Sequence, residues 1–190
     1  RLHLVESLSG NLERMINTRQ LDLAIVFQQE KILRWSARPV LEERLFLIGT
    51  HALLAPLQED HISPDQLTSL PLIMPSQGHG LRGRLEAVCQ QHHLSVEVVA
   101  DIDGLALLMQ AVRSGLGATL QPGAAISHLD HQALRVIGIA NPVLSRPNFL
   151  VSLSDDELTP AGLAARVILS KVMRQLVESD RWPGATLYAH

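Results

Sequence analysis

The sequence predicts an α/β protein folded as two lobes. Its 190 residues are 46% hydrophobic, enough apolar material to bury a substantial core. Short apolar runs alternate with amphipathic helical patterns in two successive cycles, the order typical of α/β domains. Turn-rich breaks at 70–76 and 141–147 separate the cycles, so we expect lobe I to comprise 1–72 and 146–190, and lobe II to comprise 73–145.

The first cycle begins at the start of the chain. Alternation around Leu2 and Leu4 predicts a strand, and an amphipathic helix follows with Ser9 or Gly10 as its cap. The run LDLAIVF at 21–27 is continuously apolar after its aspartate, which is typical of a strand buried on both faces of a parallel sheet. Strand, helix and strand in so short a stretch predict a compact crossover unit.

The remaining elements have local signals of their own. Ser63, Pro64 and Gln66 form a capping-box pattern that predicts a short helix. Asp101 or Asp103 is a candidate cap for a later helix, which Gly115 is expected to close as a left-handed C-cap. Thr159 and Pro160 predict the start of the last helix. The other predicted elements are strands at 45–48, 96–100, 117–122, 134–139 and 149–153, and helices at 81–92 and 105–112.

The stretch PLIMPSQGHGLRGR, at 71–84, is the strongest candidate for ligand chemistry. It is predicted to be a strand, a glycine-punctuated loop and a helix start, where free amide groups and the helix dipole favour an anion. His79, Arg82 and Arg84 would add donors or positive charge. The alternative interpretation is a solvated turn with surface arginines.

Charge and composition exclude several classes of function. The net charge is -3, the 16 basic residues are scattered, and aromatic residues make up 3%, so the chain by itself is not expected to bind nucleic acid. No run is long and apolar enough for a membrane span, and the first residues lack a signal-peptide pattern. We therefore expect a soluble, cytoplasmic fragment of a longer protein, with no membrane partner.

Motifs for catalysis and metal binding are not found. The sequence has no nucleophile elbow, P-loop, zinc-protease or dinucleotide fingerprint. His128 and His131 could share a helical turn, but a solvated helix end explains them as well, and Asp101 and Asp103 could pair as acid and base or cap a helix. Cys89 is the single cysteine and is interpreted as a small apolar residue on a helix face. No enzyme activity, metal or cofactor is predicted.

Three motifs resemble the effector-binding domain of LysR-type transcriptional regulators. They are LDLAI at 21–25, LPLIMPS at 70–76 followed by Leu81 and Arg82, and VRSGLGATLQP at 112–122. Their order and spacing extend over nearly the whole chain. The HGLR loop looks like the subgroup that includes the nitrogen assimilation and tricarballylate regulators.

The resemblance implies a fold similar to the type 2 periplasmic binding proteins, with two Rossmann-like lobes joined by two crossover strands. On this interpretation, 72–75 is the first crossover. The family pattern also implies a winged helix-turn-helix before Arg1, contact with promoter DNA only through that absent domain, and assembly into homodimers or homotetramers. The implied ligand is a small-molecule effector, typically an organic acid, bound in the interlobe cleft.

Eight positions match the family's ligand-binding loops. They are Ser7, Ser9, Ser76, His79, Arg82, Asp101, Ile102 and Phe149. Helix capping is the alternative role for each serine, and hinge packing is the alternative for Phe149. The chain departs from the pattern at Ala118, where a branched residue is usual, and it lacks a second arginine on the first lobe to clamp a diacid.

Three other functions are consistent with this architecture. A solute-binding protein for transport would have the same lobes and cleft, with an export signal upstream. A regulator domain that needs no effector would keep the fold without the ligand. A small lyase similar to prephenate dehydratase would depend on Asp101 or His79, and the sequence offers no motif in its favour.

Overall fold

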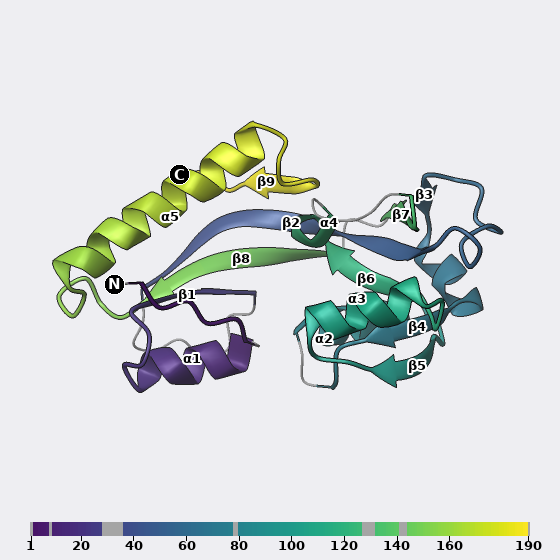
Figure 1. The fold of residues 1–190 in the computed structure, drawn as a ribbon, viewed down its shortest axis with the longest axis horizontal. Coiled ribbons are helices and arrows are strands. Elements are labelled where there is room, and N and C mark those ends of the chain that lie inside the picture. Colours follow the sequence, from purple (N-terminus) through teal and green to yellow (C-terminus); the bar gives the residue numbers. More distant parts are fainter. Residues whose placement is uncertain are drawn as a thin grey trace. The chain divides into compact units, whose positions relative to one another are not determined.

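The computed structural model describes residues 2–7, 9–27, 36–77, 80–126, 132–140 and 144–189, and it is a mixed α/β fold (Figure 1). The helices are α1 (Ser9–Asn17), η1 (Pro64–Ser69), α2 (Gly80–Gln91), α3 (Leu105–Arg113), α4 (Gly123–Ile126) and α5 (Pro160–Glu178). The strands are β1 (Leu23–Val26), β2 (Ser36–Thr50), β3 (His61–Ile62), β4 (Pro71–Met74), β5 (Glu97–Asp101), β6 (Thr119–Pro122), β7 (Leu134–Ile139), β8 (Ser145–Ser152) and β9 (Ala185–Leu187).

The chain divides into two compact units. Unit 1 contains Arg1–Glu42, Pro147–Arg181 and Thr186–His190, and unit 2 contains Glu43–Arg146 and Trp182–Ala185. The chain therefore leaves unit 1 within β2 and returns to it within β8. Two long strands that pass from one unit to the other agree with the predicted pair of crossover strands.

The first crossover lies earlier than the sequence predicted. The compact units divide at Glu42/Glu43, whereas the sequence predicted a lobe boundary at 72/73, and β4 lies in unit 2, where it pairs in parallel with β5. The sequence did not indicate a strand at this passage between the units. The middle of β2 carries charged residues, and its first half shows no apolar alternation. Only the apolar run at 45–48 was recognised as a strand, and it is the end of β2.

Unit 1 is built on β1 and β8. They pair antiparallel, from Leu23 opposite Ser152 to Val26 opposite Phe149. Burial alternates along β1, so the strand is half-buried in an antiparallel pair and is not the doubly buried parallel strand that was predicted. The apolar face of α1 contributes Leu12 and Ile16 to a core shared with β1 and β8.

The strand predicted at the start of the chain is not formed. Residues 2–7 belong to no strand, and the side chains of Leu2 and Leu4 are 76% and 82% exposed. The prediction of a strand here, made from apolar alternation alone, is therefore wrong, because residues 2–7 pair with no neighbouring strand among the described residues. The predicted crossover unit loses its first member.

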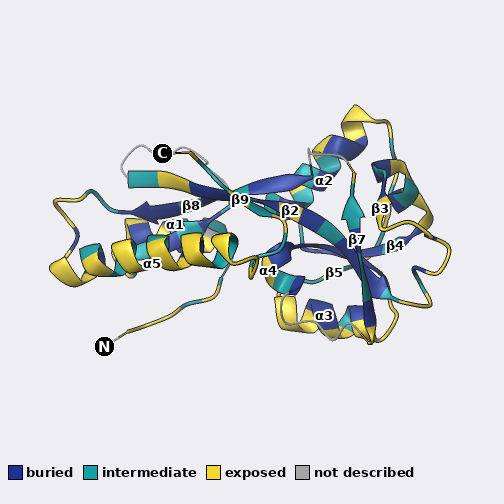
Figure 2. Ribbon diagram, turned by 90° about the horizontal axis from the view of Figure 1, so that it is seen from above, coloured by how far each residue is buried: buried dark blue, intermediate teal, exposed yellow. Residues whose placement is uncertain are grey.

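Unit 2 holds the parallel α/β element of the protein. Strand β4 leads into α2, which leads back to β5, and β5 pairs in parallel with β4 before α3 begins. Beside it, β2 pairs antiparallel with both β6 and β7. Figure 2 shows buried residues in dark blue along β2 and β4, where the largest core cluster of the unit lies.

The VRSGLGATLQP motif joins these two parts of unit 2. Gly115 has a φ of +80°, which confirms the predicted left-handed cap after α3. At Gly117, a β-carbon would lie 2.7 Å from the carbonyl oxygen of Pro71, so only glycine fits beside β4. The next residue, Ala118, donates from its N–H to that oxygen at 2.8 Å.

Several predicted helix starts are confirmed. The hydroxyl of Thr159 accepts a hydrogen bond from the N–H of Gly162 at 3.1 Å, with Pro160 in the first position of α5. The N–H of Ser63 donates to Gln66 Oε1 at 2.9 Å, which is one half of the predicted capping box. The capping pattern thus located both helices from sequence.

Candidate functional site

The loop after β4 is tied to the start of α3 by Ser76 and Asp103. The N–H and the hydroxyl of Ser76 both donate to Asp103 Oδ1, at 2.9 and 2.8 Å. The N-cap of α3 is Gly104, without a side-chain cap, so the prediction that Asp101 or Asp103 caps this helix is wrong. The carboxylate of Asp103 holds the loop instead.

Arg82 lies in the first turn of α2 and already has two acidic partners. Its Nε donates to Glu86 Oε1 at 2.7 Å, and its Nη1 donates to Asp101 Oδ1 at 3.0 Å. The Arg82 side chain is 12% exposed, whereas the two carboxylates are about half exposed. The arginine is therefore held in place, and its charge is balanced before any ligand arrives.

The described residues around this loop carry more acid than base. Glu86 and Asp101 accept from the single arginine Arg82, whereas Asp103 accepts from Ser76. The start of α2 at Gly80 adds the positive end of a helix dipole. An anion reaching this loop would compete with Asp101 for the guanidinium of Arg82, whereas a ligand hydroxyl could bind without that exchange.

Ile102 and His79 complete the set predicted for unit 2. The N–H of Ile102 donates to the carbonyl oxygen of Met74 at 2.8 Å, and its half-buried side chain packs on the core around Ile73 and Leu108. Ile102 thus fixes the backbone between Asp101 and Asp103. His79 lies outside the described residues.

The residues predicted in unit 1 have structural partners. Ser7 Oγ accepts a hydrogen bond from Asn11 Nδ2 at 3.1 Å. Ser9 is the first residue of α1, and its Oγ accepts from the N–H of Phe27 at 3.2 Å, which joins the helix start to the end of β1. Phe149 packs on the core of unit 1. The structure therefore brings Ser9 and Phe149 to the same small α/β element.

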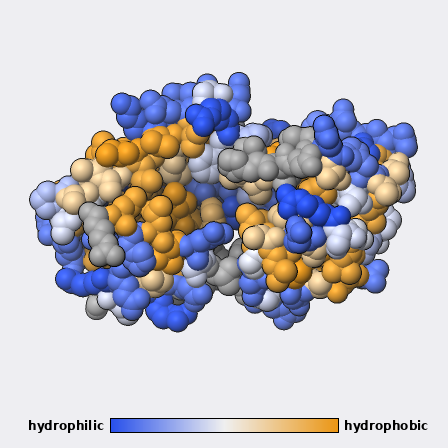
Figure 3. All heavy atoms as spheres, in the orientation of Figure 1, coloured by the Kyte–Doolittle hydropathy of each residue, from blue (hydrophilic) through white to orange (hydrophobic). Residues whose placement is uncertain are grey.

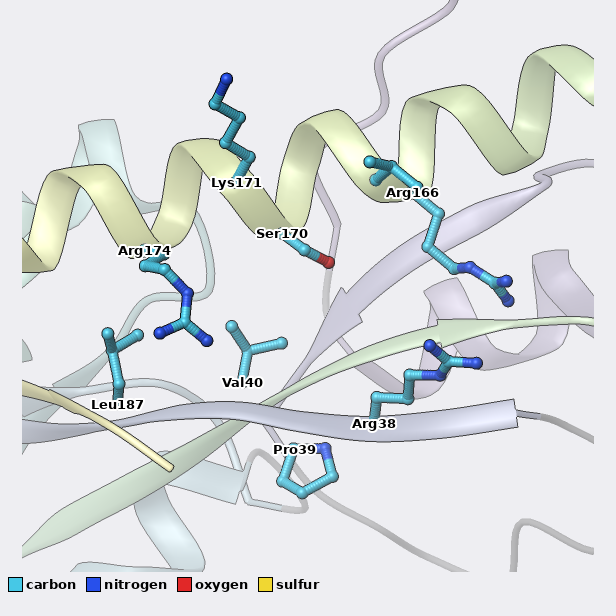
Figure 4. Close-up of a pocket in the computed structure, with 9 residues that line it drawn as sticks. Arg38, Pro39, Val40, Arg166, Ser170, Lys171, Arg174 and Leu187 are labelled. Carbon is cyan, nitrogen blue, oxygen red and sulfur yellow. The ribbon is translucent and has the colours of Figure 1, made fainter. Parts of the chain in front are cut away.

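A groove in unit 1 was missed by the sequence reasoning. It has a volume of about 390 Å³ and lies between α5 and β2 (Figure 4). Its lining residues are Arg38, Pro39, Val40, Arg166, Val167, Ser170, Lys171, Arg174 and Leu187. The available signal was the spacing of Arg166, Ser170 and Arg174, which places three polar side chains on one face of α5.

Within the described ranges, no three histidine, cysteine or acidic side chains gather as a metal site would require. His128 and His131 lie outside those ranges. In the same part of the chain, none of the helices has the length and hydropathy required to cross a bilayer.

Solved structures define the class of the fold. The effector-binding domain of QuiR in complex with shikimate matches with a TM-score of 0.73 and 18% identity, covering 86% of this chain and 77% of that one. The regulatory domain of CcmR from Synechocystis PCC6803 in complex with 2-PG gives 0.75 and 18%, covering 87% and 80%. The fold is that of LysR effector-binding domains, which is type 2 periplasmic-binding-protein-like.

The sequence places the chain in the same family. The model of the LysR substrate binding domain matches residues 1–174, and the chain belongs to that family. The nitrogen assimilation regulatory protein nac of Escherichia coli K12 is 26% identical over 190 residues, covering 95% of this chain. The transcriptional regulator CzcR of Bacillus anthracis is 29% identical over 128 residues, covering 67% of this chain and 42% of its own length. This chain spans 59% of the length of the nac protein.

Proposed function

We propose that this chain is the effector-sensing module of a LysR-type transcriptional regulator. The observation that carries the proposal is the family match over 1–174. The regulator would act in the cytoplasm without catalysis, and it would reach promoter DNA only through a domain outside this chain. The net charge of -3 supports assigning DNA contact to another domain, since nucleic-acid binding requires a basic surface.

The proposed effector is a small metabolite, with an organic acid as the first class to test. Similar domains bind shikimate in QuiR and 2-PG in CcmR. In unit 2, the hydroxyl of Ser76 and the guanidinium of Arg82 are the proposed ligand contacts. A carboxylate ligand would bind Arg82 by displacing Asp101 from its guanidinium group. The dipole at the start of α2 also favours a negatively charged ligand.

The other predicted residues are proposed to take part as well. They are Ser7, Ser9, His79, Ile102 and Phe149. Ser9 and Ile102 hold backbone in place through their hydrogen bonds to Phe27 and Met74, so their contribution would be to position the loops around the effector.

Effector binding can act as a signal only if the effector favours one arrangement of the protein over another. A ligand shifts an equilibrium only through different affinities for the two states. We propose that these states are arrangements of a homodimer or homotetramer, and that the effector changes how the DNA-binding domains are presented. A ligand that bound both states equally would leave transcription unchanged.

Calorimetric screening of small carboxylates against the intact protein tests this proposal. A carboxylate should bind, and Ser76→Ala should weaken it by about tenfold, the loss typical of a hydrogen bond to a charged group. Ser69→Ala is the matched control, because the Ser69 hydroxyl donates to the carbonyl oxygen of Gln66 within its own short helix. Equal affinity in wild type and Ser76→Ala would remove Ser76 from the site, and a screen without any binder would favour an effector-independent regulator.

A further inference from the structure

We propose that the groove between α5 and β2 in unit 1 is a second binding site, for a small organic anion with an apolar body. All nine lining residues belong to unit 1, and none is among the positions predicted for the effector. Its volume of about 390 Å³ falls in the range of small-molecule pockets, about 300 to 1,000 Å³.

Cationic side chains surround the groove. Arg166 is 11% exposed and forms an ion pair with Asp155, which also lies 3.7 Å from Arg38. Within the described part of the chain, Arg174 has one acidic partner, Glu178, at 3.9 Å, and both side chains are about half exposed. Among the described residues, three arginines of the groove thus pair with two acids that are more than half exposed, so the groove keeps a net positive charge.

The directions of the side chains separate their roles. In Figure 4, the guanidinium groups of Arg38 and Arg174 reach toward the space between helix and strand, and the Ser170 hydroxyl points into it. Lys171 points away from that space. Within the described residues, Ser170 Oγ has no hydrogen-bond partner, so it is free to donate to a ligand. Guanidinium and hydroxyl groups are the hydrogen-bond donors that suit a carboxylate.

The floor and walls of the groove are apolar. Pro39, Val40, Val167 and Leu187 line it, and Val167 is 66% exposed at its rim. Apolar surface continues along α5 in Figure 3. A bare inorganic anion would use the arginines but leave these walls in water, whereas an organic anion would bury its apolar part against them. The groove therefore favours a carboxylate with a hydrophobic body over inorganic phosphate.

Calorimetry on the intact protein tests the site with three probes. Phenylacetate should bind, while phenylacetamide, its neutral analogue, and inorganic phosphate, which lacks an apolar body, should each bind at least roughly tenfold more weakly. Arg38→Gln and Arg174→Gln should each weaken phenylacetate by roughly tenfold. Arg113→Gln is the control: it removes an exposed arginine of α3 in unit 2 and should leave the affinity of the protein for phenylacetate unchanged.

Protection of an introduced cysteine from alkylation locates the ligand without relying on the affinities of the arginine variants. In Ser170→Cys, phenylacetate should slow alkylation by iodoacetamide, a neutral reagent that does not compete for the arginines. Gln175→Cys, on an exposed position of the same helix, should react at the same rate with and without phenylacetate. The proposal is overturned if Ser170→Cys shows no protection, if phenylacetamide binds as tightly as phenylacetate, or if Ser76→Ala abolishes phenylacetate binding while Arg38→Gln retains it.

Discussion

Arg146 Nε donates a hydrogen bond to Glu43 Oε1 at 2.5 Å, and both side chains are buried in unit 2. The second carboxylate oxygen of Glu43 accepts from the indole N–H of Trp182 at 2.8 Å. Glu43 and Arg146 are the residues at which the chain enters and leaves the main segment of unit 2. Burial lowers the pKa of Arg146, while the charge of Glu43 opposes that effect.

Breaking this pair from one side is expected to destabilise unit 2 strongly. Arg146→Met leaves the carboxylate of Glu43 buried, with the Trp182 indole as its remaining side-chain donor among the described residues, and should cost about 3 to 5 kcal/mol in the free energy of unfolding. The double variant Glu43→Gln with Arg146→Met should recover much of that loss, because no buried charge remains. Urea denaturation measures both, and equal stability of the single and double variants would contradict the account.

Two glycines in unit 2 should respond oppositely to alanine. Gly117→Ala forces a β-carbon to within 2.7 Å of the Pro71 carbonyl oxygen and should cost about 1 to 3 kcal/mol. Gly83→Ala meets no atom within 4 Å on the exposed side of α2 and should stabilise the protein by about 0.5 to 1 kcal/mol. Thermal denaturation compares them. A stabilising Gly117→Ala would show that β4 does not approach this motif closely.

The thiol of Cys89 should resist modification at neutral pH. Burial, helped by the nearby charge of Glu86, raises its pKa above the ordinary 9.0. A raised pKa in the folded state contributes stability below pH 9, and this contribution is lost as the pH rises further. Alkylation of the native protein at pH 8 should therefore be much slower than in urea, and similar rates would place Cys89 at the surface.

Removing one of the two acids that pair with Arg82 should strengthen binding of an anionic effector. Asp101→Asn frees the Nη1 side of Arg82, and an exposed ion pair of this kind is worth about 0.2 to 1 kcal/mol, so affinity should rise by up to about fivefold. Glu97→Gln removes the same charge from an exposed position of the same strand and is the matched control. Calorimetry with the acid found in the screen decides, and weaker binding in Asp101→Asn would instead make that carboxylate a ligand contact.

Local signals made most of the helices predictable. The start of α5 at Thr159 and Pro160, and the end of α3 at the left-handed Gly115, depend on residues close in the sequence. The sequence was therefore sufficient to predict both helix ends. The start of β2 and the first residues of the chain were mispredicted because strand formation depends on distant partners.

The chemistry of the candidate site was only partly predictable. The sequence singled out Ser76, Arg82 and Asp101, but not that Asp103 would accept both donors of Ser76. It also gave no sign that Arg82 would be balanced by Glu86 and Asp101. These pairings depend on the parallel contact of β4 with β5, which brings together residues far apart in the sequence. The groove beside α5 was missed for the same reason, since three of its nine lining residues come from the distant strand β2.

The most direct test of the proposed sensor function is the effect of the effector on promoter DNA. The intact protein should change its affinity for its promoter, or the bend it imposes, when the carboxylate found by calorimetry is added. The same addition to Ser76→Ala should require about tenfold more ligand for half of the effect. A promoter complex that is identical with and without saturating ligand, in wild type and Ser76→Ala alike, would contradict the proposal that this chain is an effector sensor.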